Sequence, residues 1–124
     1  MANLNNTNKI MLASGARTTA TTSEDVTNTD YRGCHIIIDV TVDPASASIT
    51  PTIQGLDSVS GKYYTILAGN AISAVGTTIL KIYPGLIVAA NEVANDILPN
   101  KFRISMAVAD TDSMTYSVAA ILIR

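Results

Sequence analysis

The segment CHIIIDVTV, residues 34–42, carries the clearest structural pattern in this chain. Apolar residues occupy every second position, which places them on one face of an extended strand. That face carries Cys34, Ile36, Ile38, Val40 and Val42, and the opposite face carries His35, Ile37, Asp39 and Thr41. Such alternation predicts a strand with one face packed into a core and the other turned outward.

The same alternation returns in SMTYSVAAILIR, residues 113–124, and in shorter form elsewhere. Strands are predicted at residues 9–13, 34–42, 48–54, 63–68, 77–83, 102–108 and 114–123, with a weaker sheet-edge segment at 16–22. Clusters rich in Gly, Pro, Asp, Asn and Ser separate them and predict turns. The link DTDS, residues 110–113, joins two well-patterned strands and predicts a β-hairpin.

Many short strands at intervals of about 8–12 residues predict an all-β fold, a two-sheet β-sandwich of the jelly-roll type. Residues 1–15 are predicted to be an N-terminal arm, flexible and Asn-rich over residues 1–8, and residues 16–124 a single β-sandwich domain. Residues 23–32 are expected to form a loop. Residues 86–98 fit either a short helix or an extended crossover between sheets, and the crossover is preferred.

The composition argues for a structural or binding role. Of 124 residues, 48% are hydrophobic and 15% charged, against about 25% charged in a typical domain. A surface with so few charges favours coverage by a partner. The net charge is −2, and the Lys and Arg residues form no basic cluster in the sequence. Nucleic-acid binding is therefore not expected. No secretion signal and no apolar run of about 20 residues is present, so no membrane association is expected.

The residues needed for catalysis or metal binding are too few. Cys34 and His35 are the only cysteine and histidine, and adjacent strand residues point to opposite faces, so they cannot form a nucleophile–base pair. The lone cysteine also excludes an internal disulfide and fits assembly in a reducing cytoplasm. Asp110 and Asp112 lack the remaining ligands of a calcium loop and predict an Asp-stabilised turn. No catalytic residue, metal or cofactor is therefore expected.

Some features point to contacts instead. Asp39 and Arg103 each lie on the polar face of a predicted strand and would form a cross-strand ion pair if those strands were neighbours. The last strand is apolar on both faces, with Leu122 on one and Ile121 and Ile123 on the other. Tyr64 and Ile66 oppose Tyr63 and Leu67 in the same way. A strand that is apolar on both sides is either central in a two-layer core or lies against another subunit. Together with the low charge, these strands favour a homo-oligomer.

Several ordered strings resemble a family of small virion proteins encoded among the head genes of tailed phages. They are TNTDYRGCHIIIDVTV (27–42), ITPTIQGLDSVSGKYYTILAG (49–69), ILKIYPG (79–85), NDILPNKFRISM (95–106) and DTDSMTYSVAAIL (110–122). The resemblance implies a non-enzymatic capsid decoration (cement) protein that binds the outer surface of the major capsid protein lattice, commonly as a trimer. It implies a location on the virion exterior after assembly in the host cytoplasm, and it supplies no site residues.

Two alternatives remain open. One is a tail or head–tail joining protein, which a ring of usually six-fold symmetry would mark. The other is a carbohydrate- or receptor-binding sandwich module of a head fibre. Sugar sites generally stack rings on aromatic side chains, and this chain has no Trp and five scattered tyrosines. They are Tyr31, Tyr63, Tyr64, Tyr83 and Tyr116.

Overall fold

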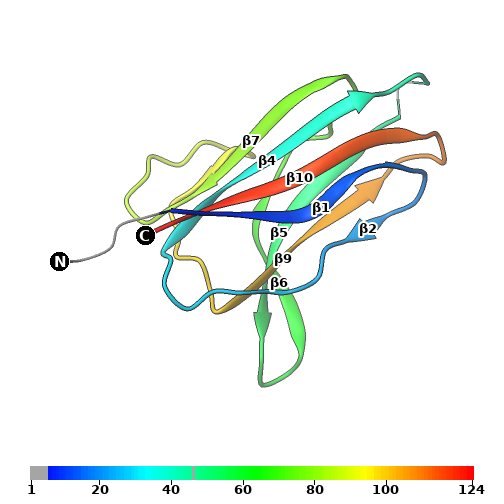
Figure 1. The fold of residues 1–124 in the computed structure, drawn as a ribbon. Helices are drawn as coiled ribbons and strands as arrows, with labels where there is room; N and C mark the ends of the chain where they lie inside the picture. Colours follow the sequence, from blue (N-terminus) through cyan, green and yellow to red (C-terminus); the bar gives the residue numbers. More distant parts are fainter. Residues whose placement is uncertain (1–5, 46) are drawn as a thin grey trace.

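The computed structural model describes residues 6–45 and 47–124, and these residues form an all-β sandwich of two sheets (Figure 1). Sheet A contains, in spatial order, β1 (Thr7–Arg17), β10 (Met114–Ile123), β4 (Gly33–Val42), β7 (Gly76–Ile82) and β8 (Val93–Ala94). Sheet B contains β2 (Thr21–Thr22), β9 (Lys101–Val108), β5 (Ile49–Asp57) and β6 (Lys62–Ala68), with β3 (Val26–Thr27) also paired to β9. The predicted all-β sandwich is confirmed.

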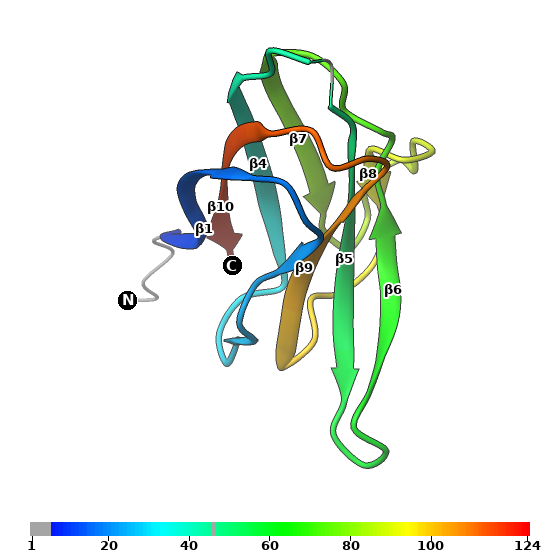
Figure 2. The same cartoon turned by 90° about the vertical axis from the view of Figure 1, so that its right-hand side faces the viewer.

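The strand pairs are nested along the chain, and this nesting defines the topology. β1 pairs with β10, β2 and β3 with β9, β4 with β7, and β5 with β6. The pairings of β10 with β4 and of β9 with β5 then join these pairs into two sheets (Figure 2). A long antiparallel hairpin folded over itself in this way is a jelly roll, as the sequence predicts.

The core lies between the sheets and is built from the alternating apolar positions. Every second residue of β4 and of β10 is buried, as the sequence patterns predict, except that Val42 at the end of β4 is 50% exposed. The largest fully buried side chains are Tyr116, Phe102, Ile36, Ile38, Ile49, Ile53, Leu80, Ile82, Ile104, Met106, Met114 and Val40. Both sheets contribute to this single cluster, so their inner faces are mutually covered.

The N-terminal boundary differs from the predicted one. β1 pairs with β10 from Thr7 onward, so residues 7–15 belong to sheet A rather than to an arm, and a boundary after residue 15 falls inside a strand. Residues 1–5 of the predicted arm lie outside the described residues. β1 contains two register shifts, between Ile10 and Leu12 and between Leu12 and Gly15. These shifts break the period of two, which explains why the sequence pattern detects only a short strand here.

Arg17 stabilises this irregular strand. Its guanidinium donates hydrogen bonds to the carbonyl oxygens of Ala13 (2.6 Å) and Gly15 (3.2 Å) on β1 and of Tyr116 (2.7 Å) on β10. The same group lies 4.7 Å from the centre of the Tyr116 ring. Charge-assisted bonds to three carbonyls replace part of the ladder that the bulges interrupt.

The hairpin predicted at residues 110–113 is wrong. β9 pairs within sheet B and β10 within sheet A, so the DTDS link carries the chain from one sheet to the other. The turn itself is present, because the Asp112 amide donates to the Asp110 carboxylate at 3.0 Å. A turn sequence specifies a local change of direction and does not specify which strand the chain pairs with afterwards.

The one connection between consecutive strands that does form a hairpin joins β5 to β6 in the described residues. Asp57 accepts hydrogen bonds from the Val59 amide and the Ser60 hydroxyl, and Gly61 adopts a φ of 74° to close the turn. Residues 86–98 contain no helix and form the preferred irregular crossover, apart from the two residues of β8. The described ranges contain no helix long and apolar enough to cross a membrane.

Candidate functional site

Cys34 and His35 lie on opposite faces of β4, as predicted. Cys34 is fully buried in the core, and burial raises the pKa of its thiol to about 12. His35 is partly exposed on the outer face of sheet A, where burial and then the nearby charge of Lys81 lower its pKa below 6.5. The thiol is protonated at neutral pH and has no contact with the imidazole, so the two residues do not form a catalytic pair.

Carboxylates do not gather into a site in the parts of the chain that the structure describes. No group of three or more His, Cys, Asp or Glu side chains is placed to hold a metal ion among these residues. Asp110 and Asp112 form the turn between β9 and β10, which confirms their predicted structural role.

The hypothesis of an ion pair between Asp39 and Arg103 is wrong, because these residues lie in different sheets. Asp39 is on β4 in sheet A, where it accepts a hydrogen bond of 3.3 Å from the Thr77 hydroxyl. Arg103 is on β9 in sheet B. The two polar faces that the sequence pattern identifies are the two opposite outer surfaces of the sandwich.

Arg103 belongs instead to a polar cluster on the outer face of sheet B. Its Nε donates to Gln54 Oε1 at 2.8 Å, and its guanidinium stacks 3.4 Å from the centre of the Tyr63 ring. The Tyr63 hydroxyl donates to both carboxylate oxygens of Asp25, at 2.9 and 2.8 Å, and this bond raises the Tyr63 pKa. The cluster connects β6 to the segment between β2 and β3, and its polar side chains contact one another.

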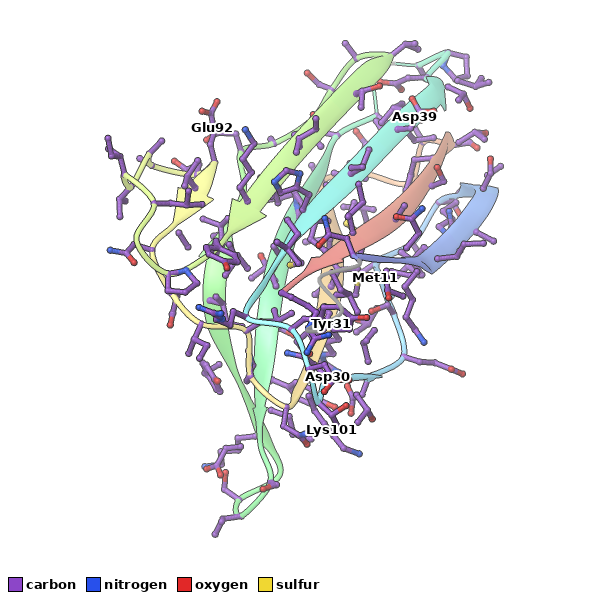
Figure 3. All side chains as sticks on the ribbon, turned by 60° about the vertical axis from the view of Figure 1, so that its left-hand side comes forward. Met11, Asp30, Tyr31, Asp39, Glu92 and Lys101 are labelled. Carbon is purple, nitrogen blue, oxygen red and sulfur yellow. The ribbon has the colours of Figure 1, made fainter. Side chains whose placement is uncertain are left out.

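The outer face of sheet A carries a row of apolar side chains that crosses four strands. Ile10 pairs with Ala119, Ala119 with Ile37, and Ile37 with Ile79, so one residue from each of β1, β10, β4 and β7 lies in register. We call these four residues the apolar row. Ile10 is 74% exposed and Ile79 is 46% exposed. Figure 3 shows these strands side by side in front of sheet B, with Asp39 near the end of β4.

Ala119 is the one small residue of the apolar row, and a shallow hollow lies beside it. The hollow has a volume of 460 Å³. It is lined by Asn8, Lys9, Ile10, Ile37, Ala119, Ala120 and Ile121. An open, apolar hollow without convergent polar groups fits a side chain of a partner better than a polar small molecule.

A second apolar surface lies on the loop between β7 and β9. Ile87 is 91% exposed, Val88 66% and Ile97 60%. The loop is held in place: the Gly85 amide donates to Asn95 Oδ1 at 2.7 Å, and Asn91 Nδ2 donates to the Ala68 carbonyl at 3.0 Å. Its apolar side chains are therefore presented on an ordered backbone.

The tyrosines do not form an exposed aromatic platform in the described structure. Tyr116 is buried in the core, and Tyr63 lies under Arg103. The Tyr31 hydroxyl forms a hydrogen bond with Thr7, and the Tyr83 hydroxyl donates to the Arg124 carbonyl. Tyr64 is 48% exposed on the projecting β5–β6 hairpin.

The alternation in the sequence predicts the outward position of one member of the apolar row, Ile37, and of Ile121 in the neighbouring row. Both positions are confirmed. The alternation did not connect them with Ile10 or Ile79, which are far away in the chain. A signal for Ile79 was present in the alternation of residues 77–83, but only the strand order brings these residues into one row.

No protein-family model matches the chain, and no curated protein sequence matches it. Among solved structures, similar chains occur in the structures of infectious bursal disease virus, Gt strain and Gx strain. Their TM-scores are 0.49 and 0.47, each at 10% identity, over 97% and 96% of this chain. This chain spans about a third of the length of those chains (33% and 32%). A likeness at this level carries no functional argument, and the jelly-roll assignment rests on the strand order above.

Proposed function

We propose that this chain is a capsid decoration protein that binds the outer surface of a tailed-phage major capsid lattice as a homo-oligomer, with a trimer expected at the three-fold positions of the shell. The observation that carries the proposal is the ordered, apolar loop between β7 and β9, with Ile87 91% exposed and Val88 66% exposed. The resemblance of the strings at residues 27–42, 49–69 and 95–106 to small virion proteins directs the choice of partner.

An ordered loop suits a protein that binds a repeating lattice. The bridge between Ala89 and Val93 and the hydrogen bond from the Lys81 amide to the Glu92 carbonyl (2.9 Å) attach the loop to sheet A. Binding then costs little additional backbone entropy, because the loop is ordered beforehand. An oligomer that uses one such loop per copy would gain affinity through several simultaneous contacts on the shell.

Decoration would stabilise the shell by mass action. A ligand that binds the expanded lattice and not its precursor shifts the equilibrium toward the expanded form. A non-enzymatic sandwich with apolar contacts needs no catalytic group for this role.

The test uses particles of the phage that encodes this chain, prepared without it. Purified chain is added to expanded and to precursor particles, and bound protein is measured after sedimentation. We expect saturable binding to expanded particles only. The double variant I87D/V88D should bind at least about tenfold more weakly, because it places charges in an apolar contact. V59D is the control, since Val59 is 96% exposed on the β5–β6 hairpin, which projects at the opposite end of the molecule from β8 (Figure 2).

Cryo-electron microscopy of the decorated particles gives the position. Density for this chain at three-fold or quasi-three-fold positions on the outer shell supports the proposal. Density confined to the portal vertex or the tail contradicts it and favours a joining protein. Equal binding of I87D/V88D and V59D would show that the loop is not part of the interface.

A further inference from the structure

The apolar row on sheet A has no covering element in the described part of the chain. Sheet B packs on the inner face of sheet A only, and the outer face is open in both ribbon views (Figures 1 and 2). Ile10 and Ile79, at the two ends of the row, are 74% and 46% exposed. Aligned isoleucines on an uncovered sheet are typical of an interaction surface, and the charges around them indicate which partner fits.

Two further rows flank the apolar row, one with a positive charge at Lys81 and the other with a negative charge at Asp39. On one side, Asn8, Ile121, His35 and Lys81 lie in register across β1, β10, β4 and β7. On the other side, Ser117, Asp39 and Thr77 lie in register across β10, β4 and β7. The outer face of sheet A therefore has a cationic flank and an anionic flank, with the apolar row between them.

We propose that the outer face of sheet A binds a second copy of this chain about a two-fold axis that runs along the apolar row. Rotation about this axis reverses the strand direction and places the apolar row of one copy on that of the other. It also brings the anionic flank of each copy over the cationic flank of its partner. Asp39 of one copy then lies opposite His35 of the other and near its Lys81, and the contact occurs twice by symmetry.

The charges select this axis over the other simple arrangement. A two-fold axis parallel to the strands would exchange β4 with β10 and leave each flank facing itself. His35 would then meet Ile121, and Asp39 would meet Ser117, so no opposite charges would pair. Complementary charges fix the register of an interface more than they add to its affinity. The placement of Asp39 and Lys81 on different flanks thus distinguishes the two geometries.

The size of the face sets the strength of the contact. Four strands about 4.8 Å apart, over about ten residues at 3.3 Å each, cover roughly 600 Å². A standard stable interface buries about 800 Å² per partner. We therefore expect a weak, reversible dimer. The hollow of 460 Å³ beside Ala119 provides the space in which an isoleucine of the second copy can pack.

Sedimentation equilibrium of the purified full chain tests the contact. The average mass of the wild type should rise with concentration from 13.0 kDa toward twice that value. I10D should dimerise at least about tenfold more weakly, because the contact would bury an unpaired carboxylate. I79D gives a second disruption at the other end of the row. V59D, an equivalent change on the β5–β6 hairpin, should dimerise like the wild type, and circular dichroism confirms that each variant is folded.

A charge exchange tests the axis. D39K and K81D should each weaken dimerisation, because each places like charges opposite one another. The double variant D39K/K81D should recover most of the wild-type association, since the attraction returns with its sign reversed. Failure of the double variant to recover overturns the proposed axis. Adding salt should weaken the wild-type dimer, in keeping with an exposed ion pair at the rim.

Other outcomes overturn the proposal as well. A wild type that stays monomeric at high concentration excludes the contact, and a dimer or trimer unaffected by I10D and I79D places the interface elsewhere. If the wild type is monomeric and I10D alone loses binding to particles, this face contacts the capsid shell instead of a second copy. The sedimentation measurement uses no particles, so its failure leaves the decoration proposal standing. Failure to bind particles likewise leaves the two-fold contact standing.

Discussion

At the scale of single residues, neighbours in the chain have opposite environments. Cys34 is fully buried between the sheets, whereas His35, the next residue, is partly exposed beside Lys81. The pleat of β4 separates them, because successive strand side chains point to opposite faces. The pKa of Cys34 therefore reflects the core and the pKa of His35 reflects the outer face of the same strand.

Cys34 should be unreactive in the folded protein. With a pKa of about 12 and no exposure, its thiolate fraction and its accessibility are both very small. We expect labelling by a thiol-specific disulfide reagent at pH 8 to be at least about 100-fold slower in buffer than in denaturant. The denatured chain is the control for intrinsic reactivity. Rapid, complete labelling of the native chain would show that the centre of sheet A opens readily.

His35 should titrate below its ordinary pKa of 6.5 in the monomer. Burial is the first cause and the charge of Lys81 the second, so K81Q should raise the pKa while leaving it below 6.5. Because the folded-state pKa is depressed, the stability linked to His35 is present above pH 6.5 and is lost as the pH falls through the folded pKa. NMR titration of this single imidazole measures it. K101Q, on sheet B, is the control and should cause no shift.

At the scale of the strand, β4 fits closely at its first residue. A side chain on Gly33 would place its Cβ 2.1 Å from the Ile82 carbonyl oxygen and 2.7 Å from Cδ2 of Tyr83. The strand begins where the chain leaves the β3–β4 loop and meets the end of β7. Glycine is required here by the close approach of two backbones.

G33A should therefore destabilise the fold, by about 1–3 kcal/mol for an overpacked site. The neighbouring atom is backbone, so β4 and β7 must separate to relieve the clash. G15A is the matched control, because the nearest atom to its Cβ would be 3.9 Å away. Urea denaturation of both variants gives the comparison. Equal urea midpoints of unfolding for G33A and the wild type would mean that the end of β7 moves away from β4 at little cost in free energy.

At the scale of the whole molecule, the nested pairing joins distant parts of the chain. Thr7 on β1 pairs with Leu122 on β10, near the two ends of the chain. β2 and β3 pair with β9, again across most of the sequence. Only β5 and β6 form an antiparallel pair of consecutive strands among the described residues, and β7 and β8 pair in parallel. The fold thus depends on contacts between residues far apart in the sequence, and each such contact requires the closure of a long loop.

Refolding should therefore be slow for a chain of this length. Folds dominated by non-local β pairing refold in milliseconds to seconds, whereas domains rich in local contacts refold in microseconds to milliseconds. Stopped-flow dilution from urea, followed by tyrosine fluorescence, measures the rate. A main refolding phase in the microsecond range would contradict the expectation.

The alternating pattern predicts the long strands of the core and their buried faces, because strand periodicity is local. Alternation identified β4 and β10 and placed Ile37 and Ile121 outward. It also separated Cys34 from His35. Where the alternation is interrupted, as at the register shifts of β1, the pattern gave only a short strand.

The choice of neighbouring strands depends on long-range contacts and could not be predicted from local patterns. The same turn chemistry at DTDS serves a hairpin or a passage between sheets, and the choice depends on long-range pairing of β9 with β5 and β10 with β4. For the same reason, Asp39 and Arg103 proved to be on opposite surfaces. The apolar row joins Ile10, Ala119, Ile37 and Ile79 from four distant segments. Local periodicity fixes the face of each residue, and the burial of the whole core fixes the order of the strands.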